Sequence, residues 1–184
     1  LEPKVRETLP AFAERLIRKR QIKRPCAIAG LSFGGVVALE VARQLANAPY
    51  PLFLLSSLRW PGQLPWYFRL GRYLPLYRHL PATSSGDHLL SRWFFQITAA
   101  EREAFKKVME QSDHRFTRWA IDALLHWRAD EPYPSTIGIH GTADRILPSV
   151  EHAQHLIRGA GHWMIRQEAR QVSDIMMRYL HHHT

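Results

Sequence analysis

The sequence has a single cysteine, Cys26, among its 184 residues, so it cannot form a disulfide bond within the chain. Small secreted domains often depend on disulfides, and one cysteine fits a reducing compartment such as the cytoplasm better.

Long hydrophobic runs are also missing. The longest, such as LFLL at 52–55, is far shorter than the roughly 20 apolar residues that a membrane-spanning helix needs. The sequence therefore excludes a membrane span.

Acidic residues are scarce: 16 Asp and Glu stand against 25 Lys and Arg, which gives a formal net charge of +9. Such a charge can indicate nucleic acid, anionic lipid or an acidic substrate as partner. The basic residues are scattered, however, and no helix-turn-helix, zinc-finger or RNA-binding signature accompanies them. We expect a solvated basic surface and no nucleic-acid partner. We also expect no metal, because most histidines lack metal-ligand spacing: His79, His88, His114, His126, His152 and His155.

The sequence does have enough apolar residues, 46%, to build the core of one domain. An apolar stripe of Val5, Leu9, Phe12 and Leu16 predicts a helix over 3–20. Short apolar runs predict strands, and longer periodic segments predict helices. The strands are expected at 26–29, 50–56, 136–140 and 154–157, and further helices at 35–46 and 167–180. This alternation predicts an α/β fold, with a mostly parallel sheet covered by helices on both faces.

Residues 58–132 differ from the rest of the chain. They are rich in aromatic residues and arginine, and prolines interrupt their first part. A capping-box pattern at 98–101 and Asp113 are each expected to begin a helix. We therefore predict a core made of residues 1–57 and 133–184, with 58–132 inserted between the two parts as a helical cap.

The segment GLSFG at 30–34 has the pattern Gly-x-Ser-x-Gly and lies between a predicted strand and a predicted helix. This context is typical of a sharp, strained turn that exposes a serine at the end of a strand. Gly30 and Gly34 are expected to remove Cβ atoms that would collide at the turn. The N–H of Phe33, at the start of the helix, would point where an oxyanion forms.

Two later loops complete a possible catalytic set. Asp144 follows the strand at 136–140, and His162 lies in the glycine-rich segment GAGHW at 159–163. Ser32, Asp144 and His162 thus all follow strand ends, where open α/β sheets build their sites. Each has a plainer interpretation, as a turn residue for Ser32 or Asp144 and as a loop histidine for His162. His140 is expected to pack near the acid loop rather than take part in chemistry.

The segments GLSFGG at 30–35, HGTADRILP at 140–148 and GAGHWM at 159–164 resemble the α/β-hydrolase superfamily, and the resemblance extends over about residues 3–180. It implies that Ser32 is the nucleophile, His162 the general base and Asp144 the residue that orients His162. Phe33 N–H would belong to the oxyanion hole, and no cofactor is implied. A serine needs a base to take its proton, and the carboxylate fixes the tautomer of that base. The competing acids Asp130 and Glu131 precede the strand and are not expected to reach His162.

One departure from the superfamily stands out. Its members usually have several strands before the nucleophile strand, together with a loop that supplies a second oxyanion N–H. Residues 1–25 contain one predicted helix and no His-Gly-type loop. We therefore expect an α/β-hydrolase fold that is incomplete at its N-terminus.

The resemblance implies a carboxylesterase-like serine hydrolase that cleaves an ester-like or other acyl bond. The aromatic residues of the cap indicate a small-molecule substrate with an apolar acyl or alcohol part, and its arginines would tolerate an anionic group. Acyltransferases, thioesterases, peptidases of short peptides and carbon–carbon hydrolases share the triad and stay open, as does a non-catalytic binding protein. A serine at position 32 argues against a dehalogenase or an epoxide hydrolase. The oligomeric state is left open.

Overall fold

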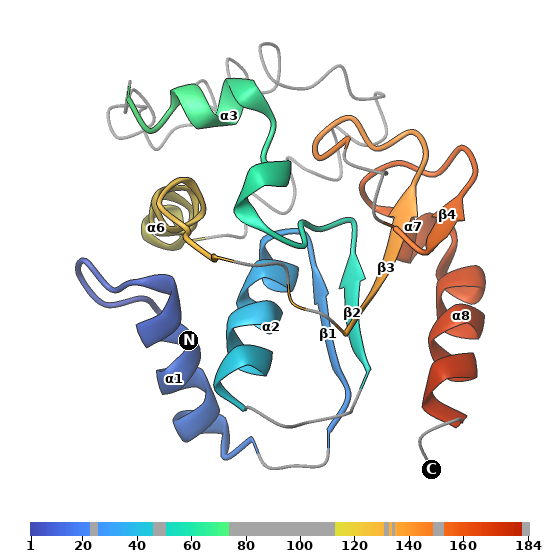
Figure 1. The fold of residues 1–184 in the computed structure, drawn as a ribbon, viewed down its shortest axis with the longest axis horizontal. Helices are drawn as coiled ribbons and strands as arrows, with labels where there is room; N and C mark the ends of the chain where they lie inside the picture. The colour runs from blue at the N-terminus through green and yellow to red at the C-terminus, as the bar shows by residue number, and fades with distance from the viewer. Residues whose placement is uncertain are drawn as a thin grey trace.

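The computed structural model describes residues 1–22, 26–45, 51–73, 113–130, 133, 135–148 and 153–181, so the capping box predicted at 98–101 lies outside them. Strands alternate with helices along these residues (Figure 1). The elements are α1 (Leu9–Arg20), β1 (Ile28–Leu31), α2 (Phe33–Gln44), β2 (Leu52–Leu55), the short 3₁₀ helix η1 (Pro61–Gln63), α3 (Trp66–Leu70), α6 (His114–Leu125), β3 (Thr136–Gly141), β4 (His155–Ile157), α7 (Met164–Gln167) and α8 (Ala169–His181).

The four strands of the described residues form one parallel sheet in the order β1-β2-β3-β4. Ile28 pairs with Leu52, Leu52 with Thr136, and Ile139 with His155. Because all strands run in the same direction, their carboxyl ends meet at one edge, the upper edge in Figure 1. In the described part of the chain β1 pairs with β2 only and forms one side of the sheet. The predicted parallel α/β fold is confirmed.

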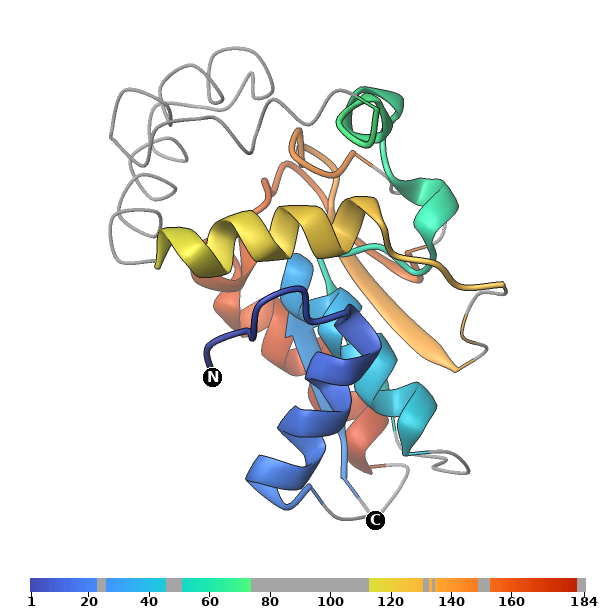
Figure 2. The ribbon, with the colours of Figure 1, turned by 90° about the vertical axis from the view of Figure 1, so that its left-hand side faces the viewer.

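Helices cover both faces of the sheet: α1 and α2 lie on one side and α8 on the other (Figures 1 and 2). Strand β2 shows how the sequence builds the two layers. Leu52 and Leu54 pack into the cluster that contains residues of α2, whereas Phe53 and Leu55 pack into the cluster that contains residues of α8. All four are buried, as expected for a continuously apolar strand between two helical layers.

Helix α1 begins later than the apolar stripe predicts. Thr8 caps it, with Oγ1 accepting from Ala11 N at 3.4 Å, and Pro10 occupies the first turn, where a missing N–H costs little. Residues 4–7 form a turn instead, in which Glu7 N donates to Lys4 O at 3.1 Å. The prediction that the helix starts at residue 3 is therefore wrong, and Val5 is 94% exposed.

Helices α3 and α6 lie on the carboxyl-end side of the sheet (Figures 1 and 2). The predicted helix start at Asp113 is confirmed, since Asp113 Oδ1 accepts from Arg115 N at 2.8 Å. The turn after α3 is attached to the end of α6, because Arg72 Nε and Nη2 both donate to Leu125 O, at 2.9 and 2.6 Å.

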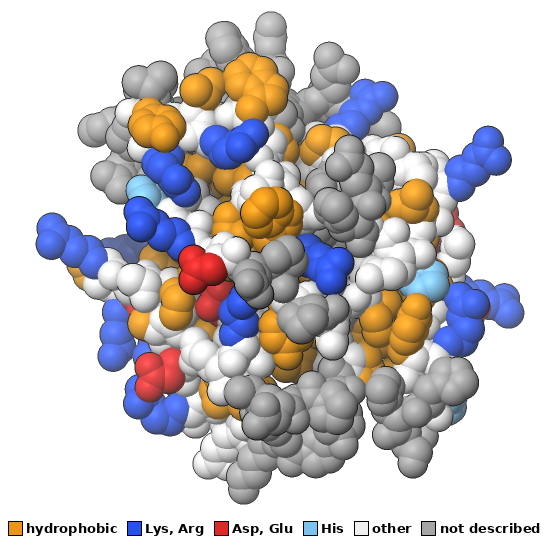
Figure 3. Space-filling view, in the orientation of Figure 1, with side chains coloured by type: hydrophobic (Ala, Val, Ile, Leu, Met, Phe, Trp, Pro, Cys, Tyr) orange, Lys and Arg blue, Asp and Glu red, His pale blue; other side chains and the backbone are white. Residues whose placement is uncertain are grey.

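None of the helices in the described residues is long and apolar enough to cross a membrane. On the face drawn in Figure 3, lysine and arginine side chains are spread out rather than gathered in one patch.

Candidate active site

Ser32 is the single residue between β1 and α2, and its backbone is strained. Its φ of 53° and ψ of −125° lie in a region that costs a non-glycine residue of order 1–3 kcal/mol. Three hydrogen bonds hold the turn. Ser32 N donates to Leu55 O at 2.9 Å, and Ser32 O accepts from Gly35 N at 3.0 Å and from Ser57 Oγ at 2.6 Å. The end of β2 thus fixes the turn that presents the serine.

The glycines of this turn differ in what they allow. A Cβ on Gly30 would collide with the backbone of Gly34, as the sequence pattern predicts. A Cβ on Gly34 would meet no atom of the described residues within 4 Å, so the prediction that Gly34 relieves a collision is wrong. Gly35 is instead the second glycine that avoids a collision, because a Cβ there would collide with the side chain of Ser57. The pattern missed Gly35, because its neighbour Ser57 lies after β2, far away in the sequence.

Phe33 is the first residue of α2, a helix of 12 residues. Its N–H is among the four at a helix start that have no acceptor within the helix, and it lies at the positive end of the helix dipole. The Phe33 ring packs edge-on against Phe116 and Trp119 of α6, with centroid separations of 6.3 and 5.6 Å. Helix α6 therefore rests on the residue next to Ser32.

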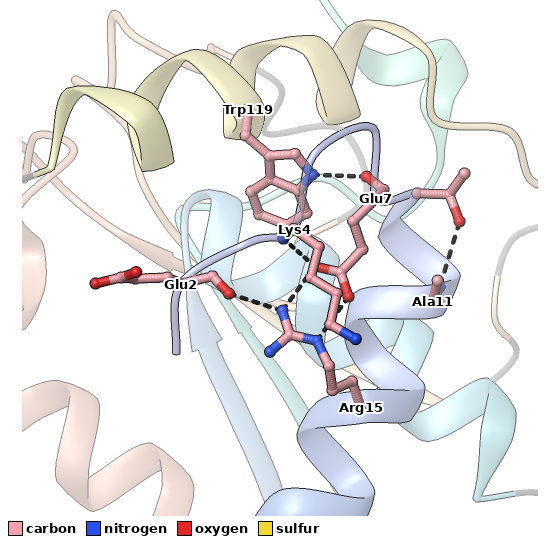
Figure 4. Close-up of polar contacts among 7 residues, drawn as sticks. Glu2, Lys4, Glu7, Ala11, Arg15 and Trp119 are labelled. Atoms are coloured by element: carbon pink, nitrogen blue, oxygen red, sulfur yellow. Dashed lines mark hydrogen bonds and ion pairs between the residues drawn. The ribbon is translucent and has the colours of Figure 1, made fainter.

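The N-terminal segment holds α6 in turn (Figure 4). Trp119 Nε1 donates to Glu7 O at 2.7 Å, and the Trp119 ring lies 4.6 Å from that of Phe12. The Glu7 carboxylate accepts from Arg15 Nε at 2.7 Å, from Arg15 Nη2 at 2.6 Å and from Lys4 N at 2.8 Å. The hydrogen bond from Arg15 lowers the pKa of Glu7, although burial acts the other way. A cavity of about 790 Å³ lies between residues 2–10 and α6, and none of Ser32, Asp144 and His162 lines it.

Asp144 and His162 meet in the interior, with exposed fractions of 4% and 3%. Asp144 Oδ2 lies 2.8 Å from His162 Nδ1. The two loops are joined by their backbones, since Thr142 N donates to Ile157 O at 3.0 Å and Ala143 N to Ala160 O at 2.9 Å. Gly141 makes this approach possible, because a Cβ there would collide with Ala160 O.

Four donors surround the Asp144 carboxylate. Oδ1 accepts from Ile146 N at 2.9 Å and from Leu147 N at 3.0 Å. Oδ2 lies 3.0 Å from His140 Nε2 as well as close to His162. Burial alone would raise the pKa of Asp144, but the hydrogen bonds from His140, His162 and the Leu147 backbone outweigh it and hold that pKa well below its usual range. The group is therefore a carboxylate at neutral pH.

The orientation of His162 follows from that contact. With Nδ1–H facing a carboxylate, the neutral ring carries no hydrogen on Nε2, which is then free to accept a proton. Among the described residues no hydrogen bond joins Ser32 Oγ to His162 Nε2; in structures without ligand such contacts are often long. Ser32, Asp144 and His162 nevertheless follow β1, β3 and β4 at the same edge of the sheet.

Sequence reasoning missed one residue of the site, Ser57 behind the turn. The prediction that His140 packs near the acid loop is confirmed, but the sequence did not indicate its direct contact with Asp144. Of the two competing acids, Asp130 is exposed and Glu131 lies outside the described residues. His126 and His155 bind Asp122 O and Tyr179 Oη, both at 2.8 Å, whereas His79, His88 and His152 lie outside the described residues. Within the described ranges no group of three or more His, Cys, Asp or Glu side chains could hold a metal ion.

Comparison with known proteins shows the family and the fold. The model of the alpha/beta hydrolase family matches residues 3–175. A search of curated protein sequences found no match. The fold is similar to that of a thermophilic esterase from Thermogutta terrifontis, with a TM-score of 0.72 and 17% identity over 98% of this chain and 74% of that one.

Two further solved structures show how widely the fold is shared. A bromoperoxidase from Bacillus anthracis has a TM-score of 0.60 and 14% identity over 97% of this chain and 76% of its own. The type II thioesterase BorB from the borrelidin biosynthetic cluster has a TM-score of 0.57 and 18% identity over 95% of this chain and 71% of its own. At such identities the likeness shows the fold and leaves the reaction open.

Proposed function

Because the chain belongs to the α/β-hydrolase family, we propose that it is a serine hydrolase that cleaves an ester-like or other acyl bond through Ser32, His162 and Asp144. One observation carries the proposal: the buried 2.8 Å contact between Asp144 Oδ2 and His162 Nδ1, at the sheet edge where the strained turn holds Ser32. The esterases among the structural neighbours support the same class of reaction.

Each side chain would have one task in the reaction. Asp144 keeps the hydrogen of His162 on Nδ1, so Nε2 takes the proton of Ser32 Oγ as Oγ attacks the acyl carbon. The carbonyl oxygen becomes an oxyanion, which Phe33 N–H stabilises. The oxyanion collapses, the leaving group departs with the proton from Nε2, and an acyl-Ser32 intermediate remains. Water then gives a proton to Nε2 as its oxygen attacks the acyl carbon. The bond from the acyl carbon to Ser32 Oγ breaks, Oγ takes the proton back from Nε2, and the acid leaves.

The substrate would have an apolar acyl or alcohol part, and residues 58–132 would form the cap that receives it. The supporting observation is the aromatic cluster at the turn, where Phe116 and Trp119 of α6 lie against Phe33. Rings next to the nucleophile favour burial of an apolar group, which contributes about 25 cal/mol per Å² of apolar surface removed from water.

A fluorophosphonate probe tests the nucleophile, since it phosphonylates activated serines. We expect labelling at Ser32, mapped by mass spectrometry of the peptides, and loss of labelling in Ser32→Ala. Ser173→Ala serves as the matched control, because Ser173 is exposed on α8 and should label like the wild type. Labelling that survives Ser32→Ala would refute the assignment.

A thioesterase is the second candidate, favoured by the likeness to the type II thioesterase. Matched acyl chains presented as p-nitrophenyl esters and as N-acetylcysteamine thioesters separate the two. A higher kcat/KM for the oxygen esters supports the carboxylesterase assignment, and a preference for the thioesters supports the alternative. A folded protein that turns over neither class and takes no probe would be a binding relative.

A further inference from the structure

Asp144 receives one donor more than the proposed triad requires, and that donor is a second histidine. His140 is the penultimate residue of β3 and only 2% exposed. Its Nε2 lies 3.0 Å from Asp144 Oδ2 and 2.7 Å from Leu147 O. A carboxylate and a backbone carbonyl can only accept, so His140 Nε2 must carry a hydrogen.

We propose that His140 is a positioning residue of the hydrolase: its Nε2–H shares Asp144 Oδ2 with His162 and fixes both the carboxylate and the loop that carries it. The inference rests on the proposed function of Ser32, His162 and Asp144.

The contacts of His140 close a ring in the acid loop. Its Nε2 touches Asp144 at one end of the loop and Leu147 O at the other, while Leu147 N donates back to Asp144 Oδ1. The carboxylate thus has two backbone amides on Oδ1 and two imidazoles on Oδ2. A rotation of the carboxylate would disturb all four contacts, so His162 always meets the same oxygen.

The shared oxygen also affects how strongly His162 holds a proton. When His162 takes the serine proton, its Nδ1–H···Oδ2 hydrogen bond becomes charge-assisted. Part of the charge on Oδ2 is already compensated by His140, so the imidazolium is stabilised less than it would be by an unshared carboxylate. Among the described residues, Asp144 and His162 are the titratable groups at His140. Ser56, which follows β2, and Leu156, the residue of β4 that pairs with His140, have side chains that do not titrate in this range.

Two variants test this role through the pH profile of kcat/KM for a p-nitrophenyl ester. His140→Leu removes the donor. We expect kcat/KM on the plateau to fall roughly 10- to 100-fold, the range for losing one hydrogen bond to a charged group. We also expect the midpoint of the acid limb to move to higher pH, because Asp144 then holds the protonated imidazole more strongly. His140→Gln places an amide N–H at a similar reach and should restore both the midpoint and most of kcat/KM.

The outcomes separate this inference from the proposed function. A folded His140→Leu protein with the wild-type midpoint, or a lost activity that His140→Gln does not restore, would overturn the positioning role alone. If the wild type shows no turnover dependent on Ser32, the proposed function fails instead. Imidazole ¹⁵N NMR of the wild type covers the case in which His140→Leu does not fold. We expect His140 protonated on Nε2, and a ring protonated on Nδ1 only would refute the contact.

Discussion

The turn that carries Ser32 and the paired loops that carry Asp144 and His162 are held in different ways. At the serine, the backbone supplies the constraint: a positive φ of 53°, close glycine packing and three hydrogen bonds to the main chain. At the acid, the constraint centres on a side chain: the buried Asp144 carboxylate has two backbone amides on one oxygen and two imidazoles on the other. Ser32 Oγ itself makes no hydrogen bond within the described residues, whereas the acid and the histidine are already joined.

This difference suits the order of events in the proposed reaction. The tautomer of His162 must be set before any substrate arrives. Burial of the pair strengthens the contact of His162 with Asp144. The serine hydroxyl must stay free to turn from the histidine to the substrate, so only its backbone is fixed. Each variant below removes a contact either from the serine turn or from the acid and histidine loops.

The largest effect is expected from His162→Ala. The serine loses its base, and kcat for an ester should fall on the order of 10⁶-fold, the scale found when a residue of a serine triad is removed. Ester hydrolysis by purified protein measures this, with probe labelling at Ser32 as a second readout. Replacing the exposed His126 by alanine is the control and should leave kcat unchanged. A loss of less than tenfold would mean that another group takes the serine proton.

Asp144→Asn should have the next largest effect, on the order of 10⁴-fold in kcat, because an amide favours the wrong tautomer of His162. The structure adds a pH signature for stability. Since the folded state holds the pKa of Asp144 below its usual range, the carboxylate stabilises the fold at neutral pH and this contribution disappears as the pH falls. The difference in unfolding free energy between wild type and Asp144→Asn should therefore shrink below about pH 4. A difference that stays constant down to pH 3 would contradict the charged, hydrogen-bonded carboxylate.

The glycines of the serine turn provide a matched pair. Gly35→Ala forces a Cβ into the Ser57 side chain, and overpacking of this kind typically costs 1–3 kcal/mol of unfolding free energy. The Cβ of Gly34→Ala meets no atom in the part of the chain that the structure describes, so this change should be neutral or stabilise the helix by roughly 0.5–1 kcal/mol. Urea unfolding of both variants measures the contrast. Equal stabilities would mean that Ser57 moves away without cost.

How far the sequence predicts the structure depends on the range of the interaction concerned. Strands follow local apolar runs, so the prediction at 136–140 differs by one residue from β3 (Thr136–Gly141). The start of α1 was missed, because the Thr8 cap and the turn at Glu7 override the apolar stripe.

Residue types and their order along the chain pointed to the candidate site, since strand ends of a parallel sheet share an edge. Contacts made across the sheet gave no local signal. Gly35 matters because Ser57 follows β2, and His140 meets Asp144 because the acid loop folds back on its own strand. The roles of the three site residues and the boundaries of the cap remain predictions.

The smallest effect is expected on the serine side. There the carbonyl of Glu7 accepts from Trp119 (Figure 4), and Trp119 packs against Phe33. Glu7→Gln loses the charge that faces Arg15 and should lower the unfolding free energy by about 1 kcal/mol. The pKa of Glu7 is lowered in the folded state, so the ion pair stabilises above the usual carboxyl pKa of about 4.3 and less as the pH falls. The loss of unfolding free energy in Glu7→Gln, measured by urea unfolding, should thus be largest near pH 6 and fade towards pH 3.

Glu14→Gln, an exposed change on α1, is the control and should show no such trend. Because Glu7 acts on the serine turn and not on Asp144, the acid limb of kcat/KM should keep its midpoint; a shift comparable to that of His140→Leu would mean that the two sides of the site are coupled.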